Sequence, residues 1–151
     1  MALWQSRHLR CGLFDAKIMH VTAAGPFGCR QCFQADAETM ARARPELICI
    51  APLVDQSHFD ISILVCPACR QRCVNIFTET IDWEGGDDPQ LVSILPVTQA
   101  ESVMLIASGK DLIASIESLG RERQHLQDAY LKGGSRRIRW VVGGLRIGPH
   151  D

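Results

Sequence analysis

The order of apolar and polar residues predicts a short helix followed by two strands. Asp36 is a residue type that caps helices, and we expect a helix over residues 37–44 that Pro45 ends. Residues 47–51 and 61–66 are rich in Ile, Leu and Val, a composition that favours strands. The polar stretch between these two segments, which contains a proline, predicts a loop.

A β-hairpin is the next element that the pattern predicts. Residues 74–81 alternate in a way that suits a strand. Residues 82–89 follow with a high density of turn-forming residues, Asp, Gly and Pro among them. The apolar segment 91–95 then returns as the partner strand, so we expect a hairpin with an acidic turn.

The region after this hairpin has the pattern of helices. Thr98 and Glu101 match a capping box, which predicts that a helix begins there, and residues 108–111 predict a break with a second cap. From Leu112 onward, apolar residues recur at helical spacings as far as Tyr130. We therefore expect an amphipathic helix to about residue 131, followed by a terminal strand in which Ile138, Trp140 and Val142 share one face.

The composition is that of a folded protein, with one unusual count. Of the 151 residues, 46% are hydrophobic and 22% charged, which argues against disorder, and the net charge of −1 gives no general affinity for nucleic acid. No apolar run has the length of a membrane span and the first ten residues lack a signal-peptide core, so we expect a cytoplasmic protein without membrane contact. Seven cysteines point to metal or redox chemistry before structural disulfides.

Four of these cysteines form two CxxC pairs that are separated by 33 residues. A two-residue spacer folds into a tight turn that points both thiolates at one ion, and two such pairs complete a tetrahedron. We therefore predict that one structural zinc ion is held by Cys29, Cys32, Cys66 and Cys69. Four thiolates leave the ion no position for water or substrate, so no zinc-centred catalysis is expected.

The two pairs resemble the knuckles of the zinc-ribbon group, in which each pair lies at the turn of a hairpin. The likeness covers residues 28–32, residues 65 to about 80 and the strand that follows. Phe33 and Arg70 stand where a glycine frequently follows the second cysteine. The likeness does not extend to the C-terminal half, whose pattern is helical, so we expect an α+β fold in which a zinc-ribbon-like β part packs against a helical segment. We expect a single domain over 1–151, with that part at 27–95 and a helical segment plus terminal strand at 96–151. The group is functionally diverse, so the resemblance implies no activity.

Other uses of the same cysteines remain open. An apolar strand running into Cys66 and Cys69 is typical of a thiol–disulfide oxidoreductase, with Cys66 as nucleophile and Cys69 as the resolving thiol. That fold needs a helix after the pair, whereas residues 74–81 have the pattern of a strand. A rubredoxin-like iron site would use the same four thiolates as zinc. A second metal site remains a further alternative, with five candidate ligands: Cys11, Cys73, His8, His20 and His58.

Two charged segments are candidate contact surfaces for a partner. The acidic turn contains Trp83 and no basic residue, while the C-terminal region from residue 121 carries seven Arg or Lys against three acidic residues. No known catalytic motif is present in the sequence. We therefore expect a non-enzymatic, zinc-stabilised binding or adaptor protein with a protein partner. The alternative is a nucleic-acid-binding regulator that uses Arg136, Arg137 and Arg139.

Overall fold

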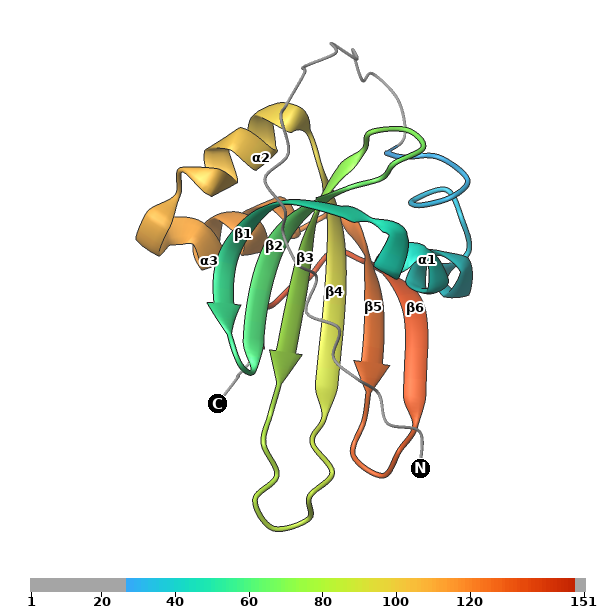
Figure 1. The fold of residues 1–151 in the computed structure, drawn as a ribbon, viewed down its shortest axis with the longest axis vertical. Coiled ribbons are helices and arrows are strands. Elements are labelled where there is room, and N and C mark those ends of the chain that lie inside the picture. Colours follow the sequence, from blue (N-terminus) through green and yellow to red (C-terminus); the bar gives the residue numbers. More distant parts are fainter. Residues whose placement is uncertain (1–26, 149–151) are drawn as a thin grey trace.

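Six antiparallel strands form one sheet in which each strand lies beside its neighbours in the sequence (Figure 1). The structure is a computed structural model and describes residues 27–148. The strands are β1 (Ile48–Gln56), β2 (Phe59–Val65), β3 (Arg72–Glu79), β4 (Gln90–Val97), β5 (Gln124–Tyr130) and β6 (Arg136–Val142). The helices are α1 (Ala37–Ala43), α2 (Gln99–Ile106) and α3 (Leu112–Leu119), with short 3₁₀ turns η1 (Arg44–Glu46) and η2 (Gly109–Asp111). The fold is therefore α+β, as the sequence predicts.

Helices cover both faces of this sheet. Successive residues of a strand point to opposite faces, and the buried residues accordingly separate into two clusters. One cluster contains Cys73 and Ile94 together with residues of α1 and the cysteine loops. The other contains their sequence neighbours Val74 and Leu95 together with residues of α2 and α3. The CxxC pairs thus belong to the α1 face of the sheet.

Local capping and turn signals correctly predict several elements. Asp36 caps α1 by accepting a hydrogen bond from the backbone N–H of Thr39, and the capping box of Thr98 and Glu101 begins α2. The expected hairpin is present as β3 and β4, and the terminal strand is β6. Each of these signals depends on residues close together in the sequence, which is why the sequence alone identifies them.

The predicted loop between the first two strands is wrong. β1 continues through Pro52 to Gln56, and β2 begins at Phe59 after a two-residue turn. β1 is an edge strand, where a proline need not remove a ladder hydrogen bond. The pairing of β1 with β2 shifts register on both sides of Pro52, which accommodates that residue within the strand.

The predicted helix from Leu112 to about residue 131 is also wrong. α3 ends at Leu119, and the chain then forms β5. A Cβ on Gly120 would lie 2.4 Å from the Cβ of Leu145, so the C-terminal segment packs directly against this end of the helix. Leu126, which the periodicity assigned to the helix, is instead fully buried in a strand between β4 and β6. No helix within residues 27–148 is long and apolar enough to cross a membrane.

Candidate metal centre

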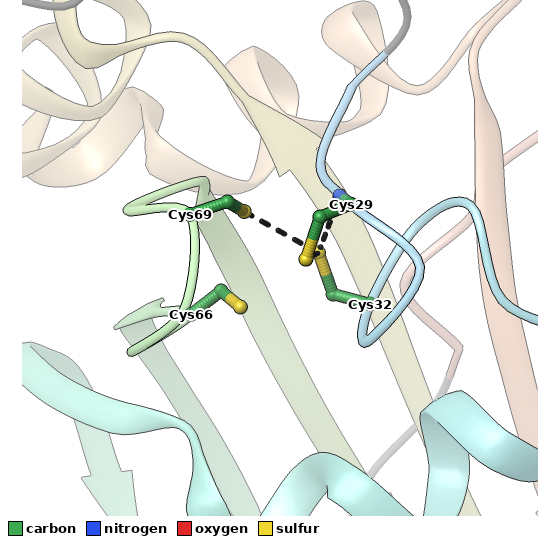
Figure 2. Close-up of side chains that lie close together, drawn as sticks. All are labelled: Cys29, Cys32, Cys66 and Cys69. Carbon is green, nitrogen blue, oxygen red and sulfur yellow. Dashed lines mark hydrogen bonds between the residues drawn. The ribbon is translucent and has the colours of Figure 1, made fainter.

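The four cysteines of the two CxxC pairs converge on one point (Figure 2). Their sulfur atoms all lie within 4.8 Å of one another. The Sγ of Cys32 is 3.8 Å from that of Cys29 and 3.7 Å from that of Cys69. Metal–sulfur bonds of about 2.3 Å in a tetrahedron place sulfur atoms about 3.8 Å apart, whereas a disulfide would hold them at about 2.05 Å. The spacing therefore fits a four-thiolate metal site, and the predicted convergence is confirmed.

The first pair lies in the loop that precedes α1, and its turn is shaped by Gly28. Gly28 has a φ of +73°, and a Cβ at this position would lie 2.6 Å from the Sγ of Cys32. The backbone N–H of Cys29 donates to the Sγ of Cys32 at 3.2 Å, and that of Gln31 donates to the Sγ of Cys29 at 3.4 Å. Backbone amides aimed at sulfur favour the thiolate, the form that binds metal.

The second pair lies in the turn between β2 and β3. The backbone N–H of Arg70 donates to the carbonyl oxygen of Cys66 at 2.9 Å, and the N–H of Cys66 donates to the carbonyl oxygen of Gln71 at 2.9 Å. Arg70 has a φ of +66° and is the only non-glycine residue with positive φ among the residues described. The turn therefore needs the left-handed conformation at the position where zinc ribbons often have glycine, but arginine occupies it.

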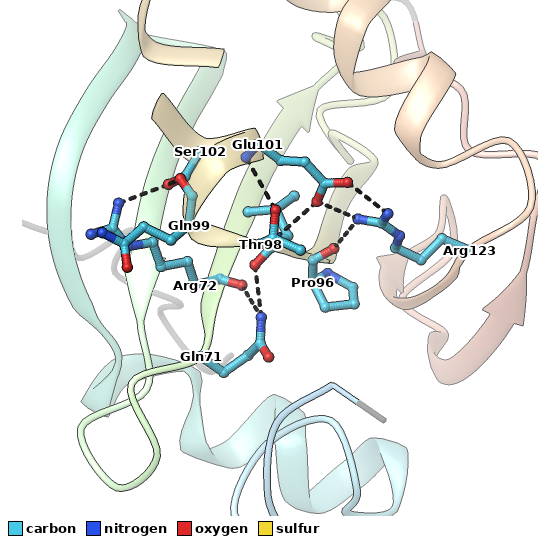
Figure 3. Close-up of polar contacts among 9 residues, drawn as sticks. Gln71, Arg72, Pro96, Thr98, Gln99, Glu101, Ser102 and Arg123 are labelled. Atoms are coloured by element: carbon cyan, nitrogen blue, oxygen red, sulfur yellow. Dashed lines mark hydrogen bonds and ion pairs between the residues drawn. The ribbon is translucent and has the colours of Figure 1, made fainter. Parts of the chain in front are cut away.

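Gln71 joins the two cysteine loops, and the sequence analysis missed it. Its Oε1 accepts a hydrogen bond from the N–H of Gly28 at 3.0 Å. Its Nε2 donates to the carbonyl oxygens of Arg72 and Val97, both at 2.8 Å (Figure 3). One side chain thus ties the first loop to β3 and β4. A lone glutamine after a CxxC pair has no characteristic spacing, so nothing in the sequence singles it out.

Burial disfavours the thiolate form of these cysteines unless a cation compensates the negative charge. It raises the pKa of the Cys32 thiol to about 11 and also raises the pKa of Cys69. Burial acts in the same direction on Cys29, but the N–H of Gln31 and the neighbouring thiols outweigh it, so the pKa of Cys29 is lowered. Several thiolates can share this space when a cation compensates their charge, which is the chemistry of a metal site.

Further candidate ligands lie outside this group of four. Cys73 is 1% exposed on β3, and burial raises the pKa of its thiol. It is not among the converging ligand atoms, and among residues 27–148 no histidine joins them either. His58 instead pairs with Glu79, with 2.8 Å between Nδ1 and Oε2. The predicted candidates Cys11, His8 and His20 lie outside the described residues.

The turn after Cys66 bears on the redox alternative. An oxidoreductase of the thioredoxin kind places its reactive cysteine at a helix N-terminus, which lowers the pKa of the thiol. Here the Cys66–Cys69 turn leads into β3, so the helix that this alternative needs is not present at that position. The same two thiols also share their space with Cys29 and Cys32. The geometry is thus that of a ligand group rather than of an isolated reactive pair.

Many charges of the basic C-terminal region are neutralised within the chain. Ion pairs join Arg123 to Glu101, Lys132 to Asp82, Arg136 to Asp128 and Arg146 to Glu117. Because side chains alternate along a strand, Arg136 also lies on the opposite face of β6 from Arg137 and Arg139. The three arginines that the sequence analysis proposed as a nucleic-acid-binding set therefore do not form one surface.

Trp83, the aromatic residue of the acidic turn, is 86% exposed.

Comparison with known proteins adds no relative to this picture. No family model, no curated protein and no solved structure matches the chain. The function proposed below therefore rests on the geometry and chemistry of the described residues.

Proposed function

We propose that the chain is a non-enzymatic protein-binding module whose fold is held together by one structural zinc ion on Cys29, Cys32, Cys66 and Cys69. The supporting observation is that the four sulfur atoms lie within 4.8 Å of one another, and that the Cys29–Cys32 and Cys32–Cys69 separations of 3.8 and 3.7 Å match the edge of a zinc–thiolate tetrahedron. Zinc in a closed thiolate shell carries no redox function and offers no coordination position to a substrate. The ion would therefore serve stability, and binding would occur elsewhere on the molecule.

The place of the cluster in the fold supports a structural role. The first loop precedes α1 and the second follows β2, so zinc would cross-link two loops that are separated in the sequence by α1, β1 and β2. Cys32 and Cys66 are 0% and 3% exposed and belong to the apolar cluster beneath α1. Structural zinc contributes about 10–16 kcal/mol to folding in small finger peptides. In this larger chain, the sheet and the second apolar cluster provide part of the stability without the ion.

We propose a protein partner in preference to nucleic acid. Four of the seven positive charges in the C-terminal region are already paired with carboxylates of the same chain. A phosphate backbone would have to compete with those pairs. If nucleic acid is nevertheless the partner, affinity for an oligonucleotide will fall steeply with salt and will be lost when Arg136, Arg137 and Arg139 are all changed to Ala; that result would refute the proposal.

Metal analysis combined with thiol counting tests the zinc site. We expect one zinc ion per chain in the purified protein, and four thiols that react with a thiol reagent only after the ion is chelated. Cys32→Ser and Cys69→Ser should each lose the zinc. Cys73→Ala is the matched control, because it removes a neighbouring buried thiol that lies outside the ligand group, and it should retain one zinc.

The same measurements separate the alternatives. A coloured protein that contains iron would refute zinc, because Zn²⁺ is d¹⁰ and has no such absorption. A metal-free protein that reduces insulin disulfides, and loses this activity in Cys66→Ser, would establish the oxidoreductase instead. Loss of zinc in the Cys73→Ala control would show that the ligand set differs from the four cysteines proposed.

A further inference from the structure

The two edges of the sheet differ in how they are protected. An exposed strand edge pairs readily with another chain unless proline, bulges or charged side chains oppose it, and charged side chains oppose only a partner of like charge. β1 has such protection, with Pro52 in the strand and shifts of register on both sides of it. β6 at the other edge pairs with β5 in unbroken register over seven residues and contains no proline (Figure 1).

Alternate backbone groups of β6 point away from the sheet. At the two ends of the hairpin, the N–H of Leu131 donates to the carbonyl oxygen of Ser135 and the N–H of Gly143 donates to that of Arg123. Hydrogen-bonded pairs alternate along an antiparallel ladder, so residues 137, 139 and 141 bond to β5. The backbone groups of residues 138, 140 and 142 therefore face outward. Within the part of the chain that is described, no backbone group pairs with them.

The side chains of β6 present different chemistry on its two faces. Ile138, Trp140 and Val142 share one face; the first two are half-buried, whereas Val142 is 76% exposed. Arg137 and Arg139 are exposed on the other face. Arg139 donates to the amide oxygen of Gln127, and Arg137 forms no ion pair with any residue from 27 to 148. The edge is thus apolar on one side and positively charged on the other.

We infer that the outer edge of β6 binds, by strand addition, an extended segment of a protein partner in which apolar and acidic side chains alternate. The inference rests on the protein-binding function proposed above and names the class of partner. An added strand would receive hydrogen bonds from the outward backbone groups of β6. Its apolar residues would cover Val142 and the rim of Trp140, and its carboxylates would lie beside Arg137 and Arg139.

A second copy of the chain is a poorer occupant of this edge. Two β6 strands paired with each other would bring two sets of Arg137 and Arg139 onto neighbouring strands. Like charges on adjacent strands oppose pairing, whereas an acidic segment gains from the same positions. Charge complementarity therefore selects the heterologous partner.

A peptide titration of the full chain tests the inference. The probe is a labelled synthetic peptide in which Glu and Val alternate, and binding is followed by fluorescence anisotropy. The zinc-loaded protein should bind this peptide, with affinity that weakens as salt is raised. It should not bind a peptide in which Lys replaces Glu, nor one whose alternate amides are N-methylated and so cannot pair with an edge.

Two substitutions test separately the backbone hydrogen bonds and the charge that the inference requires for peptide binding. Val142→Pro removes one outward N–H and leaves the hydrogen bonds to β5 in place, while Arg137→Glu reverses a charge on the edge. Each should weaken binding about tenfold or more. Lys110→Glu on η2 is the matched charge control and should change the affinity less than about twofold. Circular dichroism and zinc content of each variant establish that it is folded.

The possible outcomes distinguish this inference from the proposed function. Peptide binding that neither β6 variant weakens overturns the assignment to β6 and leaves a protein-binding function standing. No binding by a folded, zinc-loaded protein overturns the inference, while a protein without zinc refutes the metal centre independently. A dimer that forms with concentration and is abolished by Val142→Pro overturns it in favour of a second copy.

Discussion

At the scale of single residues, Arg70 stands out among residues 27–148 as the one non-glycine residue with a backbone conformation that favours glycine. Its φ of +66° lies in the left-handed region, which costs a residue with a Cβ about 1–2 kcal/mol. Glycine avoids this cost, but it lowers the free energy of unfolding by about 0.5–1 kcal/mol because it gives the unfolded chain greater conformational freedom. Arg70→Gly should therefore raise the free energy of unfolding by about 0.5–1 kcal/mol, measured by denaturant titration of the metal-loaded protein.

Two further substitutions make this prediction specific to the backbone. Arg70→Ala keeps the Cβ and should give no such gain, so equal stabilisation by Ala and Gly would contradict the argument. Gly28→Ala is the converse case, because the added Cβ would lie 2.6 Å from the Sγ of Cys32 at a φ of +73°. It should lower both the stability and the metal content, since the loop must move a ligand to accommodate the methyl group.

At the scale of elements, Glu101 anchors α2 to the sheet (Figure 3). Its carboxylate accepts a hydrogen bond from the N–H of Thr98 at 2.8 Å and two from the guanidinium of Arg123, both at 2.9 Å. The same guanidinium donates to the carbonyl oxygen of Pro96 at 2.8 Å. These contacts hold the start of α2 against the chain that enters β5, and they make Glu101→Gln an informative substitution.

The contribution of Glu101 should depend on pH in a defined direction. The hydrogen bonds and charge of Arg123 hold the pKa of this carboxyl below its ordinary value of 4.5. A lowered pKa stabilises the fold above that ordinary value, and the contribution is lost as the pH falls through the lower folded value. Glu101→Gln should therefore reduce the free energy of unfolding by about 1–2 kcal/mol at neutral pH, and by less below about pH 4.

The ion pair of Glu117 with Arg146 supplies the control for this pH dependence. Its atoms are 3.5 Å apart, and the Arg146 side chain is 82% exposed. Exposed pairs of this kind contribute about 0–1 kcal/mol, so Glu117→Gln should change the stability little at any pH. A Glu101→Gln effect that stayed constant from neutral to acid pH would show that helix capping, rather than the charge, carries the contribution.

Comparison of the predicted elements with the observed ones shows which boundaries depend on residues close together in the sequence. The starts of α1 and α2 are predictable because a capping side chain and the backbone N–H that donates to it lie three residues apart, as in Thr98 and Glu101. The extent of β1 and the change from α3 to β5 are not, because they depend on pairing with distant strands. Leu126 fits a helical stripe in the sequence, but its burial comes from β4 and β6.

The candidate site likewise has features that the sequence predicts and features that only the folded structure reveals. The convergence of the four cysteines follows from the CxxC spacing, which specifies a turn geometry without reference to the rest of the fold. The supporting contacts carry no such signal. Gln71 and Gly28 are 43 residues apart in the sequence, and Trp140 and Ala35 are 105 residues apart, so only the folded sheet brings them together.

At the scale of the whole molecule, the first cysteine loop and β6 are joined by Trp140. The indole Nε1 donates to the carbonyl oxygen of Ala35 at 3.1 Å, and the ring lies 6.0 Å from that of Phe33. Both contacts come from the loop that carries Cys29 and Cys32. A metal ion that orders this loop would therefore also order the central residue of the sheet edge to which we assign partner binding.

This coupling predicts that Trp140 reports on the metal. In a variant with Trp4→Phe and Trp83→Phe, Trp140 is the single emitting indole. Chelation should free the loop, break the contact with Ala35 and expose the ring to water, so the fluorescence maximum should move to longer wavelength and return when zinc is added. The same treatment should weaken binding of the alternating Glu–Val peptide, because the edge loses its support. A protein that loses its metal, keeps its circular dichroism spectrum and shows no change in Trp140 emission would contradict the coupling. In that case the candidate metal centre and the edge of β6 would be independent features of the molecule.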